Sequence, residues 1–152
     1  MKRRIKHVTV LGSGIMGSGI AAHFANIGVE VLLLDIVPFE LTEAEQKKGL
    51  TKESKVVRNR IATESLAKLV KASPALLYKK EFADRISVGN FDDDLPKIKN
   101  TDWIIEVVVE RLDIKKSVYE KIEQFRKPGT LVSSNTSGIP INMLVEGRSA
   151  DF

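Results

Sequence analysis

Cysteine is absent from the 152 residues of this chain. No disulfide framework, thiolate metal site or cysteine nucleophile is therefore possible within it. No apolar run reaches about 18 residues, the length that a membrane-spanning helix needs, so we expect no membrane span. The N-terminus is basic like the start of a signal peptide, but the apolar stretch behind it ends at Gly12 and is too short. A chain without cysteine suits the cytosol, and we expect a cytoplasmic protein.

Basic residues exceed acidic ones only slightly, with 24 Lys and Arg against 20 Asp and Glu and a net charge of +4. Between Glu40 and Lys80, however, ten basic residues stand against five acidic ones, so this segment is more positive than the whole chain. It is either a solvated helical surface or a docking surface for a phosphorylated ligand. No aromatic stacking motif is interleaved with the basic residues, so we do not expect a nucleic-acid partner.

Short aliphatic and β-branched runs alternate with helical periodicity along the chain. They predict strands at residues 7–12, 29–35, 85–89, 102–110 and 130–135. The Lys-, Glu-, Ala- and Leu-rich residues 41–80 predict two or three helices, with breaks at Gly49 and at Ser73-Pro74. Alternating strands and helices imply a parallel sheet that helices cover on both faces.

Two further helices are indicated by apolar residues three and four positions apart. In the first, the predicted apolar face comprises Met16, Ile20, Phe24 and Ile27, and Gly28 follows where a helix end favours a left-handed residue. In the second, the face comprises Ile114, Val118, Ile122 and Phe125.

The predicted fold is α/β, a Rossmann-type doubly wound parallel sheet with a helical insert between the second and third strands. It occupies residues 1–152 as one domain. A full doubly wound dinucleotide-binding domain has six strands, and only five are predicted here. We therefore expect the chain to be truncated before the end of the domain.

A dinucleotide fingerprint follows the first predicted strand. Residues 12–17, with the sequence GSGIMG, fit the pattern G-x-G-x-x-G and open a predicted helix. Asp35 ends the next strand, 18 residues after Gly17, close to the expected spacing of about 20. The pattern alone is weak, but this context favours a dinucleotide site over a glycine-rich turn without a ligand.

Each residue of the fingerprint has a separate expected role. Gly12 allows a tight turn, Gly14 lets a pyrophosphate approach the backbone, and Gly17 lets the helix pack closely. The N–H groups at the helix start, where Ile15 and Met16 lie, point with the positive helix end at the phosphates. We therefore expect these five residues to bind the cofactor.

Asp35 predicts which cofactor is bound. Its carboxylate can accept hydrogen bonds from both adenosine ribose hydroxyls and would repel a 2′-phosphate. No Arg follows it within three residues to offset that repulsion. NAD is therefore expected rather than NADP, although the fingerprint alone does not exclude FAD.

Two polar clusters follow the later strands, where ligands of open α/β sheets bind. Glu110 ends the predicted fourth strand with Lys115 just after it, and the run SSNTSG, residues 133–138, ends the fifth. Singly, Glu110 could be a surface ion pair with Lys115 or a helix N-terminal acid, and the run could be turn and capping chemistry. Together, beside a dinucleotide loop, they favour a binding site.

Three segments carry a family resemblance: VTVLGSGIMGSGIAAHFA, DWIIEVVVERLDIKK and SSNTSGI. They resemble successive signatures of the N-terminal domain of 3-hydroxyacyl-CoA dehydrogenases, in that order and over nearly the whole chain. The variant with VLLLDIVP and a long basic helical insert resembles the dehydrogenase of large bacterial and archaeal fatty-oxidation proteins, where an enoyl-CoA hydratase module follows it.

The resemblance implies roles for individual residues. The fingerprint glycines and Asp35 would hold the ADP half of NAD, and Glu110 and Lys115 would line the path to the nicotinamide ribose. Asn135 and Ser137 would lie beside the nicotinamide as catalytic residues, with Ser137 orienting the 3-hydroxyl of the substrate. The basic insert resembles the arm that contacts acyl-CoA. The implied reaction is NAD-dependent oxidation of an L-3-hydroxyacyl-CoA to the 3-ketoacyl-CoA, in a full-length homodimer.

One departure concerns the general base, which in this family is a His in a G-x-H-F-F-N-P motif, oriented by a downstream Glu. The chain ends at Phe152, before that motif is due, and His7 and His23 are expected to be structural or surface residues. We therefore expect NAD binding without turnover. Two alternatives stay open: a hydroxy-acid dehydrogenase for substrates without CoA, and a non-catalytic NAD-sensing or partner-binding module.

Overall fold

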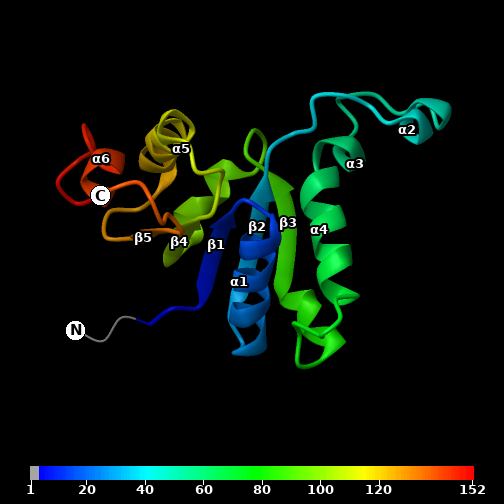
Figure 1. The fold of residues 1–152 in the computed structure, drawn as a ribbon, viewed down its shortest axis with the longest axis horizontal. Coiled ribbons are helices and arrows are strands. Elements are labelled where there is room, and N and C mark those ends of the chain that lie inside the picture. The colour runs from blue at the N-terminus through cyan, green and yellow to red at the C-terminus, as the bar shows by residue number, and fades with distance from the viewer. Residues whose placement is uncertain (1–3) are drawn as a thin grey trace.

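The computed structural model describes residues 4–152, which form a five-stranded parallel sheet flanked by helices (Figure 1). The strands are β1 (His7–Leu11), β2 (Glu30–Asp35), β3 (Ile86–Asn90), β4 (Trp103–Glu106) and β5 (Leu131–Ser134). Their order, β3-β2-β1-β4-β5, confirms the doubly wound prediction and matches five of the six strands of that architecture.

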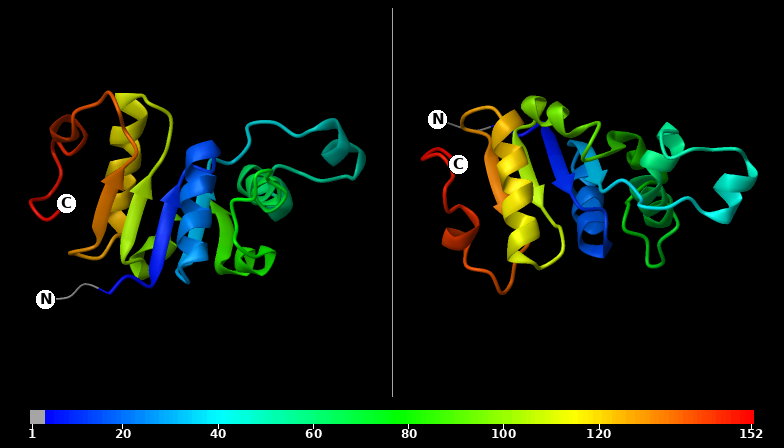
Figure 2. Two further views of the ribbon diagram at one scale, coloured as in Figure 1. Left: turned by 60° about the horizontal axis from the view of Figure 1, so that its bottom comes forward. Right: turned by 90° about the horizontal axis from the view of Figure 1, so that it is seen from above.

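The helices are α1 (Ile15–Asn26), α2 (Glu43–Lys47), α3 (Lys55–Arg58), α4 (Arg60–Val70), α5 (Leu112–Phe125) and α6 (Ile141–Leu144), with 3₁₀ turns at Lys80–Arg85 and Leu95–Asn100. Three of them lie between β2 and β3 and confirm the predicted helical insert. Residues 41–80, which we call the arm, contain α2, α3 and α4. The tip of the arm, with α2, projects away from the sheet, at the opposite end of the molecule from α6 and the C-terminus (Figures 1 and 2).

Two apolar cores fill the two faces of the sheet, because successive strand residues point to opposite sides. On one face, Val10 and Leu33 pack with α1 and α4. On the other face, Leu11 and Leu34 pack with α5, α6 and the second 3₁₀ turn. No helix in residues 4–152 has both the length and the apolar character to cross a membrane.

The prediction of a fourth strand over residues 102–110 is wrong in its second half. β4 ends at Glu106, and residues 107–110 form a loop before α5. Strand β1 ends at Leu11, opposite Glu106, and β5 ends at Ser134, also opposite Glu106. Residues 107–110 therefore have no neighbouring strand, in spite of their high β-propensity. Glu110 consequently lies on a loop, four residues beyond the end of the strand.

The predicted apolar face of α1 is also wrong in part. Met16 and Ile27 are 56% and 59% exposed, whereas the residues that face the sheet are mostly small: Gly17, Ser18, Ala21, Ala22, Phe24 and Ala25. Small residues let the helix axis lie close to the sheet, so the large aliphatic side chains are displaced from the contact. In α5, the prediction is right for Ile122, which is buried, and for Val118, which packs against the core, but Phe125 is exposed and Lys115 and Tyr119 are buried in addition.

Candidate functional site

The predicted site residues come together at the carboxyl edge of the sheet. Leu11 of β1 is in register with Leu34 of β2 and with Glu106 of β4, and Glu106 is in register with Ser134 of β5. Because these strands are parallel and end at one level, the loops that follow them share one edge. This edge is where ligands bind in open α/β sheets.

The glycine loop has the backbone geometry that its sequence predicts. Gly12 has a φ of +109°, and a Cβ atom on it would lie 2.6 Å from the carbonyl oxygen of Val107. A Cβ atom on Gly17 would lie 1.8 Å from the carbonyl oxygen of Gly12. Only glycine fits either position, so the predicted turn and the predicted close packing are both present.

The start of α1 is open on the side where a diphosphate is predicted. Nothing lies within 4 Å of a Cβ atom built on Gly14, and Ile15 is 93% exposed. No side chain caps this helix start, and its first turn contains no acidic residue. Within residues 4–152 no side chain therefore occupies the positive end of α1 as a cap, which suits an anionic ligand.

Asp35 contacts the glycine loop through Ser13, a residue that we did not single out from the sequence. Both the amide nitrogen and the hydroxyl of Ser13 lie 2.6 Å from Oδ2 of Asp35, and the amide of Ile36 donates to Oδ1. The Ser13 hydroxyl is also 3.0 Å from that of Ser65 in α4. A hydroxyl at the second position of the fingerprint, 22 residues before an acid, was the available signal. Ser13 thus holds the Asp35 carboxylate beside the glycine loop, and its contact with Ser65 connects this loop to the arm.

The β4–β5 side of the edge is built on a buried ion pair. Glu106 and Lys115 have no exposed side-chain surface, and their charged atoms are 2.8 Å apart. Glu106 also accepts hydrogen bonds from the amide of Val108 at 2.7 Å and from the hydroxyl of Ser134 at 2.5 Å. We did not assign Glu106 a role from the sequence. The available signal was a charged residue inside the apolar run DWIIEVVV, because a charge is costly to bury unless it is paired.

Glu110 binds the loop that follows β5. Its Oε1 accepts hydrogen bonds from the Thr136 hydroxyl at 2.6 Å and from the amides of Gly138 at 2.9 Å and Ser137 at 3.1 Å. Lys115 lies 3.3 Å from its other oxygen. These donors, the Thr136 hydroxyl foremost, lower the pKa of Glu110 to about 2. Glu110 is thus both the ion-pair partner of Lys115 and the anchor of this loop.

The remaining predicted residues, Asn135, Ser137 and Lys115, differ in their exposure to solvent. Asn135 and Ser137 are exposed, and the Asn135 amide donates to the carbonyl of Glu106. Lys115 is wholly buried, so in this structure it acts on the edge through Glu106 and Glu110. The contacts of all three with a cofactor or substrate stay predictions.

Neither histidine lies at this edge. His7 begins β1 at the amino end of the sheet, where its ring is 3.8 Å from Asp102. His23 is an exposed residue in the last turn of α1. Both placements agree with the structural or surface roles expected of them, and neither residue is positioned as a base for chemistry at the carboxyl edge.

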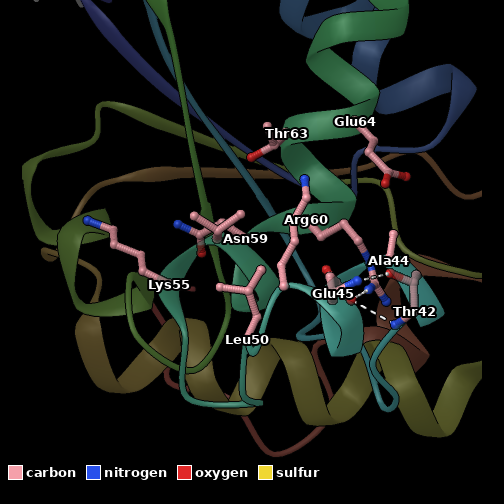
Figure 3. A pocket seen from close by; sticks show the side chains of 11 residues that line it. Thr42, Ala44, Glu45, Leu50, Lys55, Asn59, Arg60, Thr63 and Glu64 are labelled. Atoms are coloured by element: carbon pink, nitrogen blue, oxygen red, sulfur yellow. Dashed lines mark hydrogen bonds and ion pairs between the residues drawn. The ribbon is translucent and has the colours of Figure 1, made fainter.

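A groove of about 530 Å³ lies within the arm, between α2 and the start of α4 (Figure 3). Arg60 forms an ion pair with Glu45 on one side of the groove, and the side chain of Lys55 lies apart from them (Figure 3). Outside the groove, Arg58 binds Asp93 through two hydrogen bonds of 2.7 and 2.8 Å. Arg58 and Arg60 of the basic segment are thus paired with acidic residues of the chain itself, and Lys48 and Lys55 are the lysines that line the groove.

A smaller groove of about 310 Å³ joins the glycine loop to the arm. It runs between the start of α1 and α4, and Ser13, Gly14, Ser65 and Lys68 are among its lining residues. With Ser18, which also lines the groove, one lysine and three serine hydroxyls therefore lie next to the open helix start. This groove makes the arm and the fingerprint parts of one continuous surface.

Comparison with known proteins shows the family. The family described as "3-hydroxyacyl-CoA dehydrogenase, NAD binding domain" matches residues 7–151. The chain belongs to this family. NAD is therefore its cofactor, and the open start of α1, the glycines and the acceptor Asp35 fit the diphosphate and the adenosine ribose of NAD.

Individual relatives carry similar names. The chain is 54% identical over 152 residues to a probable 3-hydroxyacyl-CoA dehydrogenase of Bacillus subtilis, covering all of this chain and 19% of that protein. It is 37% identical over 146 residues to a Rickettsia felis protein named as a fatty acid oxidation complex trifunctional enzyme, covering 96% of this chain and 18% of that protein. The structure of (S)-3-hydroxybutyryl-CoA dehydrogenase PaaH1 from Ralstonia eutropha aligns with a TM-score of 0.64 at 28% identity, over 96% of this chain and 46% of that one. The chain spans less than half of each of these proteins.

Proposed function

We propose that this chain is the NAD-binding part of an enzyme that oxidises L-3-hydroxyacyl-CoA to 3-ketoacyl-CoA in fatty-acid oxidation. In this reaction the C3 hydrogen leaves as hydride, NAD⁺ is reduced to NADH, and the hydroxyl proton passes to a base. The observation that carries the proposal is the convergence of the glycine loop, Asp35, Glu110 and the loop after β5 at one edge of the sheet. NAD supplies the hydride acceptor when it is bound.

The chain's own residues bind and orient. The amides at the start of α1 hold the diphosphate, and Asp35 accepts hydrogen bonds from the adenosine ribose. Glu110 holds the backbone of Ser137 and Gly138 in place, which orients the Ser137 hydroxyl for the 3-hydroxyl of the substrate. Positioning of this kind is a large part of what a protein contributes to cofactor chemistry.

The arm is proposed to contact the acyl-CoA substrate. Lys48 and Lys55 in its larger groove and Lys68 in the smaller one provide cations for CoA phosphates. The smaller groove leads from the arm to the glycine loop, so one ligand can extend from the arm toward the cofactor. The homodimer and the cytoplasmic location stay predictions.

Calorimetric titration of the 152-residue chain with NAD⁺ tests the proposal. Asp35→Ala should weaken binding about ten- to a hundred-fold, because hydrogen bonds to a charged group contribute about 1.5–3 kcal/mol. Asp84→Ala removes an exposed acid at the amino end of β3 and should leave the affinity unchanged. A folded wild-type chain without affinity for NAD⁺, or equal affinities for all three proteins, would refute NAD binding at this edge.

Two further measurements separate the alternatives. Binding of CoA by the 152-residue chain, weakened when Lys48, Lys55 and Lys68 are replaced by Met, supports an acyl-CoA substrate; a chain that binds NAD⁺ but never CoA favours a hydroxy acid without CoA. With acetoacetyl-CoA and NADH, the chain should show no turnover, because neither histidine lies at the carboxyl edge. Turnover at the rate of a full-length relative would contradict that expectation.

A further inference from the structure

The charges behind the loop after β5 do not balance. Two carboxylates, Glu106 and Glu110, share one ammonium group, that of Lys115, at 2.8 and 3.3 Å. This triad therefore carries one net negative charge. Glu106 and Lys115 are fully buried, and only Glu110, which is 41% exposed, faces solvent. The uncompensated charge is thus presented at the carboxyl edge.

The position of the triad relative to the cofactor follows from the sheet. In doubly wound folds the dinucleotide crosses the point where the strand order reverses, and each half of the sheet receives one mononucleotide. Asp35, at the end of β2, marks the adenosine half. The triad lies at the end of β4 and in the segment that follows it, across β1 from β2, so the nicotinamide mononucleotide would face it.

The two redox states of the cofactor differ in charge at this end. The nicotinamide ring of NAD⁺ carries one positive charge, whereas the ring of NADH is neutral. A fixed negative charge nearby attracts the first and not the second, and screening is weakened beside a buried pair.

Resting on the proposed function, we propose that Glu106 is a positioning residue that occupies Lys115, leaves Glu110 uncompensated, and thereby raises the affinity of the chain for NAD⁺ relative to NADH. Glu106 does not touch the cofactor, because its side chain has no exposed surface. It acts by holding the ammonium group of Lys115 closer to itself than to Glu110.

Other charged groups near the triad leave this balance intact. Arg111 pairs with Asp113, and Lys116 pairs with Glu146, so each cation has its own acid. Burial raises the pKa of Tyr119 to about 12, so its hydroxyl is neutral at physiological pH. The positive end of α5 is present in every variant with an intact helix, and it therefore cancels when variants are compared.

The test is the ratio of two dissociation constants, Kd for NAD⁺ over Kd for NADH, measured by calorimetry on the 152-residue chain at low salt. Glu106→Gln keeps a side chain of the same shape and removes one charge, so Lys115 neutralises Glu110. The ratio should rise about three- to ten-fold, the size of a screened interaction between unit charges. Glu120→Gln, an exposed acid on the same helix as Lys115, should leave the ratio unchanged.

A structural role would give a different result. If Glu106 only supported the loop, Glu106→Gln would weaken NAD⁺ and NADH equally, and an unchanged ratio overturns the proposal. Should Glu106→Gln fail to fold by circular dichroism, Glu110→Gln removes one charge from the same triad at its exposed end and should raise the ratio in the same direction; an unchanged ratio there also overturns it. Absence of any NAD(H) binding by the wild type would instead refute the proposed function.

Discussion

The two halves of the carboxyl edge are built in different ways. On the adenosine side, the glycine loop and the start of α1 offer backbone amides, and Gly14 leaves open space around them. On the β4–β5 side, side-chain charges already bind one another, with Lys115 between Glu106 and Glu110. The adenosine side is therefore formed by glycines, which have no side chain, and the β4–β5 side by charged side chains that are buried together.

This difference has an energetic consequence. Backbone donors at a helix start cost little to leave exposed to water, so the adenosine side needs no partner to be stable. A buried charge without its partner costs several kcal/mol, so the β4–β5 side depends on the complete triad. The adenosine side should therefore respond to changes in backbone packing, and the other side to changes in charge.

The largest expected effect is on the β4–β5 side. Lys115→Met removes the ammonium group and leaves the charge of Glu106 buried without its cationic partner, which should lower the free energy of unfolding by about 3–5 kcal/mol. Urea denaturation followed by circular dichroism measures it. Lys116→Met, the neighbouring residue in a surface pair with Glu146, should cost at most about 1 kcal/mol. Similar losses for the two variants would remove the distinction between the two halves.

A smaller effect is expected from backbone packing on the adenosine side. Gly17→Ala places a Cβ atom 1.8 Å from the carbonyl oxygen of Gly12, so the loop or the helix must move, at a cost of about 1–3 kcal/mol. Gly19→Ala, in the same helix with nothing within 4 Å, should instead stabilise the chain by about 0.5–1 kcal/mol. Thermal unfolding of both variants gives the sign, and a stabilising Gly17→Ala would show that the close approach is not needed.

The smallest effect is a titration on the β4–β5 side. The donors around Glu110, with the Thr136 hydroxyl first, lower its pKa from 4.5 to about 2. Because the folded-state pKa lies below the ordinary one, the contribution of Glu110 to stability is fully present above about pH 4.5. It is lost as the pH falls toward about 2.

Nuclear magnetic resonance can follow this titration through the amide signals of Ser137 and Gly138. Both amides donate to Glu110, so their signals should shift with a midpoint near pH 2 and stay constant above pH 4.5. In a Glu110→Gln variant the same signals should not titrate over this range. A midpoint at 4.5 in the wild type would mean that the loop does not hold the carboxylate in solution.

Much of the fold could be predicted because it depends on local patterns. All five strands lie where aliphatic and β-branched runs predict them, and Gly28 has the expected left-handed backbone with a φ of +87°. The extension of the fourth strand to Glu110 failed because a strand also needs a neighbour, and none of the strands in residues 4–152 reaches that far. The predicted apolar face of α1 was right for Phe24 and wrong for Met16 and Ile27, because small residues of the helix set its distance to the sheet.

The candidate site was predictable to a similar degree. The fingerprint, Asp35, Glu110 and the residues after β5 do meet at one edge, as strand order and spacing predicted. Ser13 and Glu106 were missed, because their importance comes from the groups that they contact. Only a contact 22 residues away identifies the role of Ser13, and only burial identifies that of Glu106.

The sequence by itself determined the order of strands and helices, the turn at Gly12, the open helix start and the identity of the acid at the end of β2, because each depends on residues that are close along the chain. Tertiary structure alone decided where β4 ends, which face of α1 is buried and how Lys115 divides its charge between two carboxylates. Those outcomes depend on neighbours that are brought together only when the parallel strands align, and pair energies change with burial far more than with residue type.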